Sequence, residues 1–191
     1  MKPKLIKSNP KVMSRYLLKL INEVKRPYSK IVILCIGTDR VTGDCIGPLL
    51  GTLLVESKIN FEVIGTLSSP VHAINLNDVI KTIDKDSLII AVDACFGLNK
   101  EIGGVLVHEG NMYPGKGIGK TDISPVGDIS VQGVVASYIF PDKAFQALQD
   151  ANLNTVYNIV QDLRECLKLL DSYINHKRKL KFGGLMEWLW F

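Results

Sequence analysis

The spacing of hydrophobic and polar positions predicts alternating helices and strands along most of the chain. In residues 10–25, apolar side chains recur every three or four positions, which is typical of a helix with one buried face. Residues 31–36 (IVILCI) and 87–95 (SLIIAVDAC) are short apolar runs rich in β-branched residues. Such runs predict strands that are buried on both faces, as in a parallel sheet. Residues 154–175 again have helical spacing, and Asn154 stands where it can cap that helix.

Weaker patterns predict further elements between these. Residues 46–56 predict a helix, residues 61–65 a second strand, and residues 66–83 a loop that runs into a helix. A fourth and a fifth strand are predicted over residues 103–110 and 129–136. Because strands alternate with helices, we expect an α/β fold, a three-layer sandwich with a mostly parallel central sheet.

Composition limits the class of protein. The chain has 191 residues, of which 47% are hydrophobic and 22% charged, so we expect one domain with a substantial core over residues 1–175. The net charge of +4 comes largely from the two ends, so direct binding of nucleic acid is not expected. No apolar run reaches the roughly 20 residues that a membrane span needs, and no secretory signal is apparent. The four cysteines form no C-x-x-C pair, which favours a reducing, cytoplasmic location.

Residues 176–191 form a tail of different composition, in which a basic stretch (HKRKLK) precedes an aromatic one (LMEWLWF). Exposed clusters of tryptophan and phenylalanine rarely stay in water. The tail is therefore expected either to dock on a partner or a neighbouring subunit, as in a homo-oligomer, or to fold back onto its own domain.

Two aspartates stand where a parallel sheet places its functional residues. Asp44 lies in the loop after the first strand, and Asp93 lies at the carboxyl end of the third. If the strand order is 2-1-3, which is common in such sheets, both reach the point where the strand order reverses and ligands bind. His72, in the loop after the second strand, comes to the same rim.

Two acids at such a rim cannot both ionise cheaply, so one pKa rises and the other falls. The ionised acid can then deprotonate a water molecule while the protonated acid polarises a carbonyl group. We expect no cofactor, although the same pair together with a histidine is an alternative site for a divalent metal.

Each of these residues also has a simpler interpretation. Asp44 alone is most simply the cap of the following helix, Asp93 can be structural, and His72 can be a hydrogen-bonded loop residue. Cys45 and Cys95, which lie next to the two aspartates, are most simply small apolar filler. A thiol nucleophile with His72 as its base is the alternative.

A glycine-rich segment, residues 110–128, follows the fourth strand. It is not a phosphate-binding loop, because the motif ending at Thr121 needs glycine where Pro114 stands. We expect this segment to form a wall beside the crevice. The residues expected to contact the substrate are Gly37, Thr38, His72, Gly115, Lys116 and Gly117.

Five motifs occur together and in order: GTDRVTGDCIGPLLG (37–51), GTLSSPVHAINL (65–76), LIIAVDAC (88–95), PGKGIGK (114–120) and VGDISVQGVV (126–135). Together they resemble the spore protease family, and in particular the sporulation proteins related to the germination protease. The resemblance spans residues 31–170. The wider group includes the hydrogenase-maturation endopeptidases.

This resemblance implies a phosphorylase/hydrolase-like α/β sandwich of the hydrogenase maturation protease type. It also implies that Asp44 and Asp93 are the catalytic core of an aspartic-type endopeptidase, with the small acid-soluble proteins of spores as possible substrates. In the hydrogenase-maturation branch a glutamate replaces the first aspartate, and both acids sense nickel with a histidine that has no clear counterpart here.

We therefore expect a cytoplasmic endopeptidase of a sporulating cell or spore core, in which Asp44 and Asp93 activate water against a protein or peptide substrate. Two alternatives stay open on the same scaffold. One is a non-catalytic peptide-binding or assembly factor, and the other is a metal-sensing maturation factor.

Overall fold

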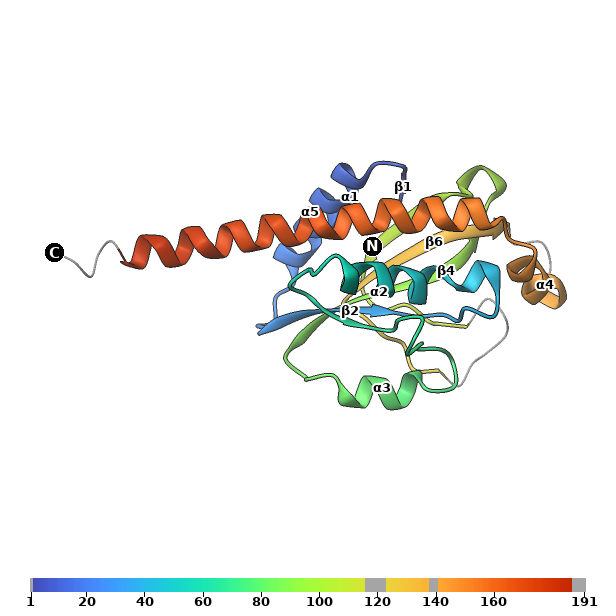
Figure 1. Ribbon diagram of the computed structural model, residues 1–191, viewed down its shortest axis with the longest axis horizontal. Coiled ribbons are helices and arrows are strands. Elements are labelled where there is room, and N and C mark those ends of the chain that lie inside the picture. Colours follow the sequence, from blue (N-terminus) through green and yellow to red (C-terminus); the bar gives the residue numbers. More distant parts are fainter. Residues whose placement is uncertain (1, 116–122, 138–140, 187–191) are drawn as a thin grey trace.

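The computed structural model of the protein describes residues 2–115, 123–137 and 141–186, and the side chains as far as residue 176. Within these residues the chain forms a six-stranded sheet in the order β1-β5-β6-β4-β2-β3 (Figure 1). Strands β6, β4, β2 and β3 run parallel, whereas β5 is antiparallel to β6 and β1 is antiparallel to β5. The strands are β1 (Lys4–Lys7), β2 (Lys30–Cys35), β3 (Glu62–Ile64), β4 (Ser87–Gly97), β5 (Gly104–Glu109) and β6 (Ile129–Ser137).

Helices cover both faces of the sheet and give three layers (Figure 1). On one face lie α1 (Pro10–Glu23), α2 (Ile46–Glu56) and α5 (Leu153–Met186), and α5 contacts both of the others. On the opposite face lies α3 (Leu76–Thr82). The short α4 (Ala144–Gln149) packs against β6 and against the turn that contains Asp44.

Strand β2 shows how the sequence builds these layers. Ile31, Ile33 and Cys35 belong to the larger hydrophobic core, which includes residues of α1, α2 and α5. Val32 and Leu34 belong to the smaller core on the side of α3. All five side chains are buried, as a central parallel strand requires, and this explains the continuous apolar run.

The predicted α/β sandwich is confirmed, and so is the order of its central strands. Neighbours β3-β2-β4 form the expected 2-1-3 arrangement. The edges differ from the prediction, because β5 runs antiparallel to β6 and the unpredicted strand β1 pairs with it. Strand β4 also continues beyond Asp93 to Gly97 alongside β6, with a shift of register between Cys95 and Phe96.

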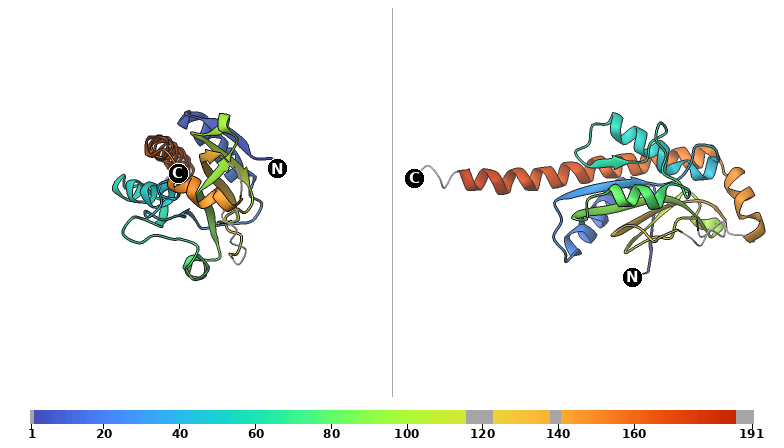
Figure 2. Two further views of the ribbon diagram at one scale, coloured as in Figure 1. Left: turned by 90° about the vertical axis from the view of Figure 1, so that its right-hand side faces the viewer. Right: turned by 90° about the horizontal axis from the view of Figure 1, so that it is seen from below.

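The last helix is longer than predicted. Helix α5 runs from Leu153 to Met186 without a break at the expected end of the domain, and its second half extends beyond the sheet (Figure 2). Asn152 rather than Asn154 caps it, because Asn152 Oδ1 accepts the backbone N–H of Thr155 at 3.1 Å. Lysine, arginine and leucine favour helix, which explains its continuation through the basic stretch. Neither α5 nor any other helix in the described part of the chain is long and apolar enough to cross a membrane.

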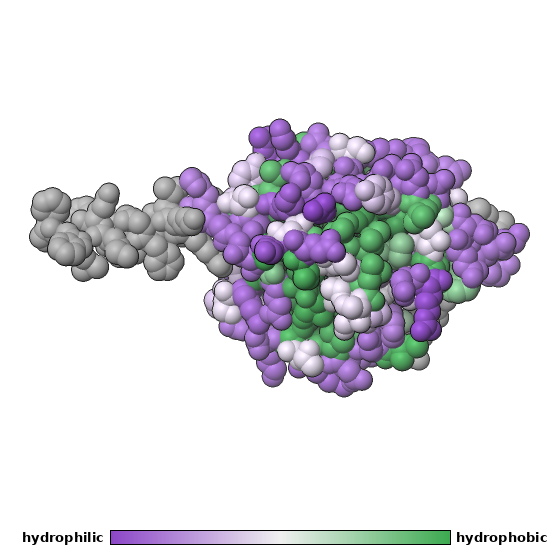
Figure 3. All heavy atoms as spheres, viewed as in Figure 1, coloured by the Kyte–Doolittle hydropathy of each residue, from purple (hydrophilic) through white to green (hydrophobic). Residues whose placement is uncertain are grey.

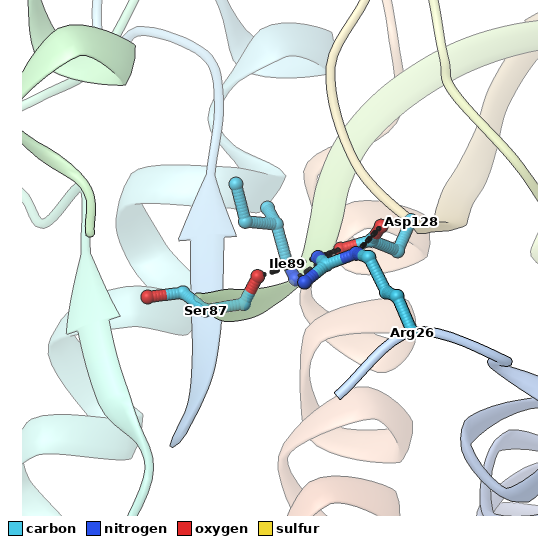
Figure 4. A network of polar contacts seen from close by, with 4 residues as sticks. All are labelled: Arg26, Ser87, Ile89 and Asp128. Atoms are coloured by element: carbon cyan, nitrogen blue, oxygen red, sulfur yellow. Dashed lines mark hydrogen bonds and ion pairs between the residues drawn. The ribbon is translucent and has the colours of Figure 1, made fainter. Parts of the chain in front are cut away.

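An ion pair fixes the amino-terminal end of β4, the end opposite Asp93 (Figure 4). The guanidinium of Arg26 donates to both carboxylate oxygens of Asp128, at 3.2 and 2.6 Å, and to the carbonyl oxygen of Ser87 at 2.6 Å. Asp128 Oδ2 also accepts the N–H of Ile89 at 2.8 Å. The residue that precedes β6 is thereby held against the first residues of β4.

Candidate active site

The loop after β2 folds back tightly and brings Asp44 to the carboxyl end of the strand. Gly37 has a φ of 140°, and a Cβ atom there would lie 2.0 Å from the carbonyl oxygen of Asp44. A Cβ atom at Gly47 would lie 2.1 Å from the carbonyl oxygen of Ile36, so this glycine lets the first turn of α2 approach the end of β2. Only glycine permits contacts this close. Gly37 and Gly47, two of the four glycines of the first motif, therefore position the aspartate between them.

The carboxylate of Asp44 is bonded to the main chain of this loop. The backbone N–H of Thr38 donates to Asp44 Oδ2 at 3.0 Å and to the Asp44 carbonyl oxygen at 3.1 Å. The N-terminal cap residue of α2 is Cys45, whose side chain makes no capping hydrogen bond. Asp44 therefore does not occupy the cap position of α2 that the simpler interpretation assigned to it. Its negative charge is stabilised instead by a main-chain donor within its own loop.

Asp93 lies on β4 one residue beyond the last pair between β4 and β2, which joins Cys35 to Val92. Its side chain is buried, with only 6% of the residue exposed, and its Oδ1 accepts the N–H of Ala94 at 2.8 Å. Among the described residues, no lysine, arginine or histidine forms an ion pair with it. A buried carboxyl without a cation is stable only when it keeps its proton.

The two carboxyl groups are close enough for the charge of one to act on the other. The turn Thr42–Asp44 contacts β4. Burial, and then repulsion from Asp44, raises the pKa of Asp93 well above its ordinary value, while the N–H of Ala94 acts more weakly in the opposite direction. Asp93 therefore favours the protonated form over a range of pH in which an exposed aspartate is ionised.

The loop after β3 is tied to the same edge of the sheet. The N–H of Gly37 donates to the carbonyl oxygen of Val71 at 2.8 Å. The next residue, His72, donates its backbone N–H to Asn75 Oδ1 at 2.8 Å, and its Nδ1 accepts the N–H of Ile74 at 3.4 Å. These bonds favour the simpler interpretation of His72 as a hydrogen-bonded loop residue, although it also lines the cleft described next.

A cleft of about 490 Å³ opens where these two loops face α4. Thr38, Asp44 and His72 are the predicted site residues that line it. Most of its remaining wall is apolar and comes from Val41, Pro70, Ala73, Ile74, Phe145 and Leu148. Asp93 is not part of the wall, so Asp44 is the member of the pair that faces the cleft directly.

The cysteines beside the pair are poorly suited to nucleophilic attack. Cys45 Sγ donates to the carbonyl oxygen of Thr42 at 3.0 Å, and burial raises the pKa of its thiol. Burial, with repulsion from Asp93 and Glu101, raises the pKa of Cys95 to about 12. A thiol nucleophile needs a lowered pKa, so the geometry gives no support to the thiol alternative.

The remaining predicted contacts lie away from the cleft or outside the described residues. Gly115 has a left-handed φ of 72° and does not line the cleft, while Lys116 and Gly117 lie outside the described residues. Helix α4 was not predicted from the sequence, and it supplies Phe145 and Leu148 to the cleft. The spacing of three between these two apolar residues was the available signal for a helix there.

The donors at the site set a limit on metal binding. In the part of the chain that the structure describes, no group of three or more histidine, cysteine, aspartate or glutamate side chains is placed to hold a metal ion. Asp44 and Asp93 alone offer two carboxyl groups, one of which favours its proton. A protonated carboxyl is a poor metal ligand, because ligands bind in their deprotonated form.

Comparison with known proteins finds similarity in sequence, in fold and to a family model. The chain is 43% identical to the uncharacterized protein YyaC of Bacillus subtilis strain 168 over 145 residues. The aligned region covers 74% of this chain and 69% of YyaC. The fold is similar to that of the [NiFe] hydrogenase maturation protease HycI from Thermococcus kodakarensis KOD1, with a TM-score of 0.52 and 17% identity over 80% of this chain and 99% of HycI. At that identity the likeness shows the fold alone, and it agrees with the type of α/β sandwich that the motifs implied.

The family match covers every element from β1 to the first part of α5, including both aspartates. Residues 4–165 match the family model described as protein of unknown function DUF1256. The chain therefore belongs to the DUF1256 family.

Proposed function

We propose that this protein is an endopeptidase in which Asp44 and Asp93 act together on a water molecule. The observation that carries the proposal is the buried carboxyl of Asp93, which has a raised pKa and no ion-pair partner among the described residues, beside an Asp44 that lines an apolar cleft. Such an arrangement costs stability, and perturbed acids of this kind cluster at functional sites. The shared fold adds support, because HycI is a maturation protease by name.

In the proposed reaction, ionised Asp44 accepts a proton from water, and the water oxygen attacks the carbonyl carbon of the scissile peptide bond. Protonated Asp93 does not line the cleft, so in this scheme it donates a hydrogen bond to the carbonyl oxygen where the substrate reaches past Asp44, and it stabilises the negative charge that develops there. When the carbon–nitrogen bond breaks, the proton held by Asp44 passes to the leaving nitrogen. The pair then again holds one proton, and the products are a carboxylic acid and an amine.

The five motifs support a narrower proposal, a sporulation protein related to the germination protease. The protein then acts in the cytoplasm of a sporulating cell or in the spore core. Its partners are protein or peptide substrates, among them the small acid-soluble spore proteins. No cofactor is needed in this scheme, because the acid pair supplies both proton transfers.

A peptide-binding protein without catalysis is the second candidate, and the apolar wall of the cleft favours it. Such a protein binds peptides saturably and does not turn them over. The metal-sensing alternative has less support, because no set of three ligands occurs in the described part of the chain.

Proteolysis followed by mass spectrometry tests the proposal. The parent protein and its Asp44→Asn and Asp93→Asn variants are incubated with unstructured peptides and with acid-soluble spore proteins, and cleavage products are identified. Each variant is expected to lose at least about 100-fold in rate, the usual share of a general acid or base. Asp86→Asn is the matched control, because Asp86 is exposed near the opposite end of β4.

Circular dichroism spectra establish that the variants are folded. If both amide variants cleave as fast as the parent, the acid pair is not catalytic. If the parent binds peptides saturably but cleaves none, the second candidate is favoured.

A further inference from the structure

The rim of the cleft carries two large apolar side chains that are exposed to solvent. Ile74 is 85% exposed and Phe145 is 51% exposed, and both line the cleft. They come from different elements, the loop before α3 and helix α4. Large apolar residues that gather at one depression on a surface mark a place where another molecule binds.

The inner wall of the cleft is apolar as well. Val41 and Leu148 are buried, and Pro70 and Ala73 add no charge. The volume of about 490 Å³ lies within the range of natural ligand pockets. An occupant that fills this space therefore buries apolar surface against residues of two loops and one helix.

The charged residues that line the cleft distinguish between the classes of apolar ligand that could bind there. Asp39, Arg40 and Asp44 line it, so its carboxylates outnumber its guanidinium by one. An anionic amphiphile such as a fatty acid meets a net negative wall and is disfavoured. An apolar side chain of a peptide brings no charge of its own and is attached to a neutral backbone, so it suits both the apolar wall and the charges around it.

We propose that the cleft is a subsite for one bulky apolar side chain of an extended peptide, such as phenylalanine or leucine, with Ile74 and Phe145 closing over it. Its role in cleavage rests on the proposed function. Because Asp44 lines the same cleft, a side chain bound there would determine which peptide bond lies nearest the acid pair. Binding itself does not depend on catalysis. The two ideas can therefore be tested separately.

Peptide binding to the Asp93→Asn variant tests the subsite without turnover. This variant keeps the charge of Asp44, and its neutral amide replaces a carboxyl that favours its proton. Fluorescein-labelled peptides of glycine and serine, each with one central phenylalanine, leucine, alanine or glutamate, are titrated by fluorescence anisotropy. The phenylalanine and leucine peptides are expected to bind at least about ten-fold more tightly than the alanine peptide.

Substitutions at the rim, made in the Asp93→Asn background, locate the preference. Ile74→Ser and Phe145→Ser together are expected to reduce it to less than about three-fold, because the apolar contacts at the rim are removed. Hydrophobic surface also gathers over α2 on the face shown in Figure 3, so a control is needed there. Val55→Ser is that control, because Val55 lies on α2, is 55% exposed and does not line the cleft. It is expected to leave the preference unchanged.

The outcomes separate the subsite from the catalytic proposal. Equal binding of the alanine and phenylalanine peptides overturns the subsite, as does a preference that survives the double rim substitution. Displacement of the phenylalanine peptide by decanoate at lower concentration than by unlabelled peptide also overturns it, in favour of a fatty acid. A clear apolar preference in a parent protein that cleaves nothing supports the subsite and contradicts the endopeptidase.

Discussion

The carbonyl oxygen of Asp44 occupies the space that a side chain at Gly37 would need, because a Cβ atom there would lie 2.0 Å from that oxygen. The adjacent N–H of Thr38 donates to both the main-chain and the side-chain oxygen of the same aspartate. The position of the Asp44 carboxylate therefore depends on a residue seven positions earlier in the chain.

Gly37→Ala is accordingly expected to move Asp44 and to reduce peptide cleavage by at least about ten-fold. The added methyl group forces the loop open, and alanine is also strained at a φ of 140°. The measurement is kcat/KM on a cleaved peptide, with urea unfolding to confirm a folded domain. Gly110→Ala is the control, because Gly110 also has a positive φ, of 98°, but no atom lies within 4 Å of its added Cβ. Parent-like cleavage by the Gly37→Ala protein contradicts this role for the loop.

The raised pKa of Asp93 makes stability depend on pH with a definite sign. The native state holds this proton above about pH 4, where the unfolded chain releases it. The native state therefore binds more protons than the unfolded state, and the free energy of unfolding falls as pH rises from about 4 through the raised pKa. Asp93→Asn, which cannot ionise, is expected to lack this component.

Urea unfolding at several pH values measures the difference. The variant is expected to gain stability relative to the parent as pH rises, by up to about 1.4 kcal/mol for each unit of pKa shift. The comparison uses the difference between the two proteins, because titrating groups away from Asp93 contribute equally to both. A constant difference between pH 4 and pH 8 contradicts a raised pKa.

Sequence alone led to the central strands and to the acid pair for the same physical reason. A strand buried on both faces must be apolar throughout, so β2 and β4 are visible as continuous runs, and residues at their carboxyl ends must meet once the strands are neighbours. Asp93 directly follows Val92, which pairs with Cys35, the last residue of β2. The glycines around Asp44 were visible, but the contact that requires Gly37 joins atoms whose positions no local pattern fixes.

The parts that sequence reasoning missed depend on tertiary packing. Strand β1 has four residues and lies at an edge, where only Ile6 is fully buried, and such a strand has almost no periodic signal. The direction of β5 depends on which neighbour it finds rather than on its own residues. To predict the cleft wall, one would need to know where α4 lies relative to the loop that contains Ile74. These two segments are about seventy residues apart in the chain, and no local pattern relates them.

The thiols offer a test of the alternative nucleophile. Burial raises the pKa of Cys45, and raises that of Cys95 to about 12, so both stay protonated at neutral pH. A Cys45→Ser, Cys95→Ser double variant is expected to keep cleavage within about three-fold of the parent, and iodoacetamide at pH 7.5 is expected to leave the parent active. Loss of cleavage in the serine variant, with an unchanged unfolding curve, supports a catalytic thiol instead.

Removal of metal ions is expected to leave cleavage unchanged. The proposed reaction uses only the proton transfers of Asp44 and Asp93, and the described residues supply no third ligand beside them. Activity after dialysis against EDTA and calorimetric titration with nickel and zinc are the measurements. Cleavage that disappears with EDTA and returns with one added metal contradicts the metal-free reaction, and tight binding lost in Asp93→Asn favours metal sensing.

The network around Arg26 is expected to stabilise the fold without touching the reaction. Its guanidinium donates hydrogen bonds to both carboxylate oxygens of Asp128 and to the carbonyl oxygen of Ser87. Ser87 lies six residues before Asp93, roughly 20 Å along an extended strand.

Arg26→Ala is expected to lower the free energy of unfolding by about 1–3 kcal/mol, since charge-assisted bonds at a partly buried site are lost. Lys19→Ala, which removes an exposed helical ion pair with Glu23, is the control and is expected to cost less than about 0.5 kcal/mol. Because the network lies at the start of β4, well before Asp93, kcat/KM is expected to stay at the parent value while the urea midpoint falls. A loss of kcat/KM in the folded Arg26→Ala protein contradicts this separation and shows that the anchoring of β4 at its start also sets the position of Asp93.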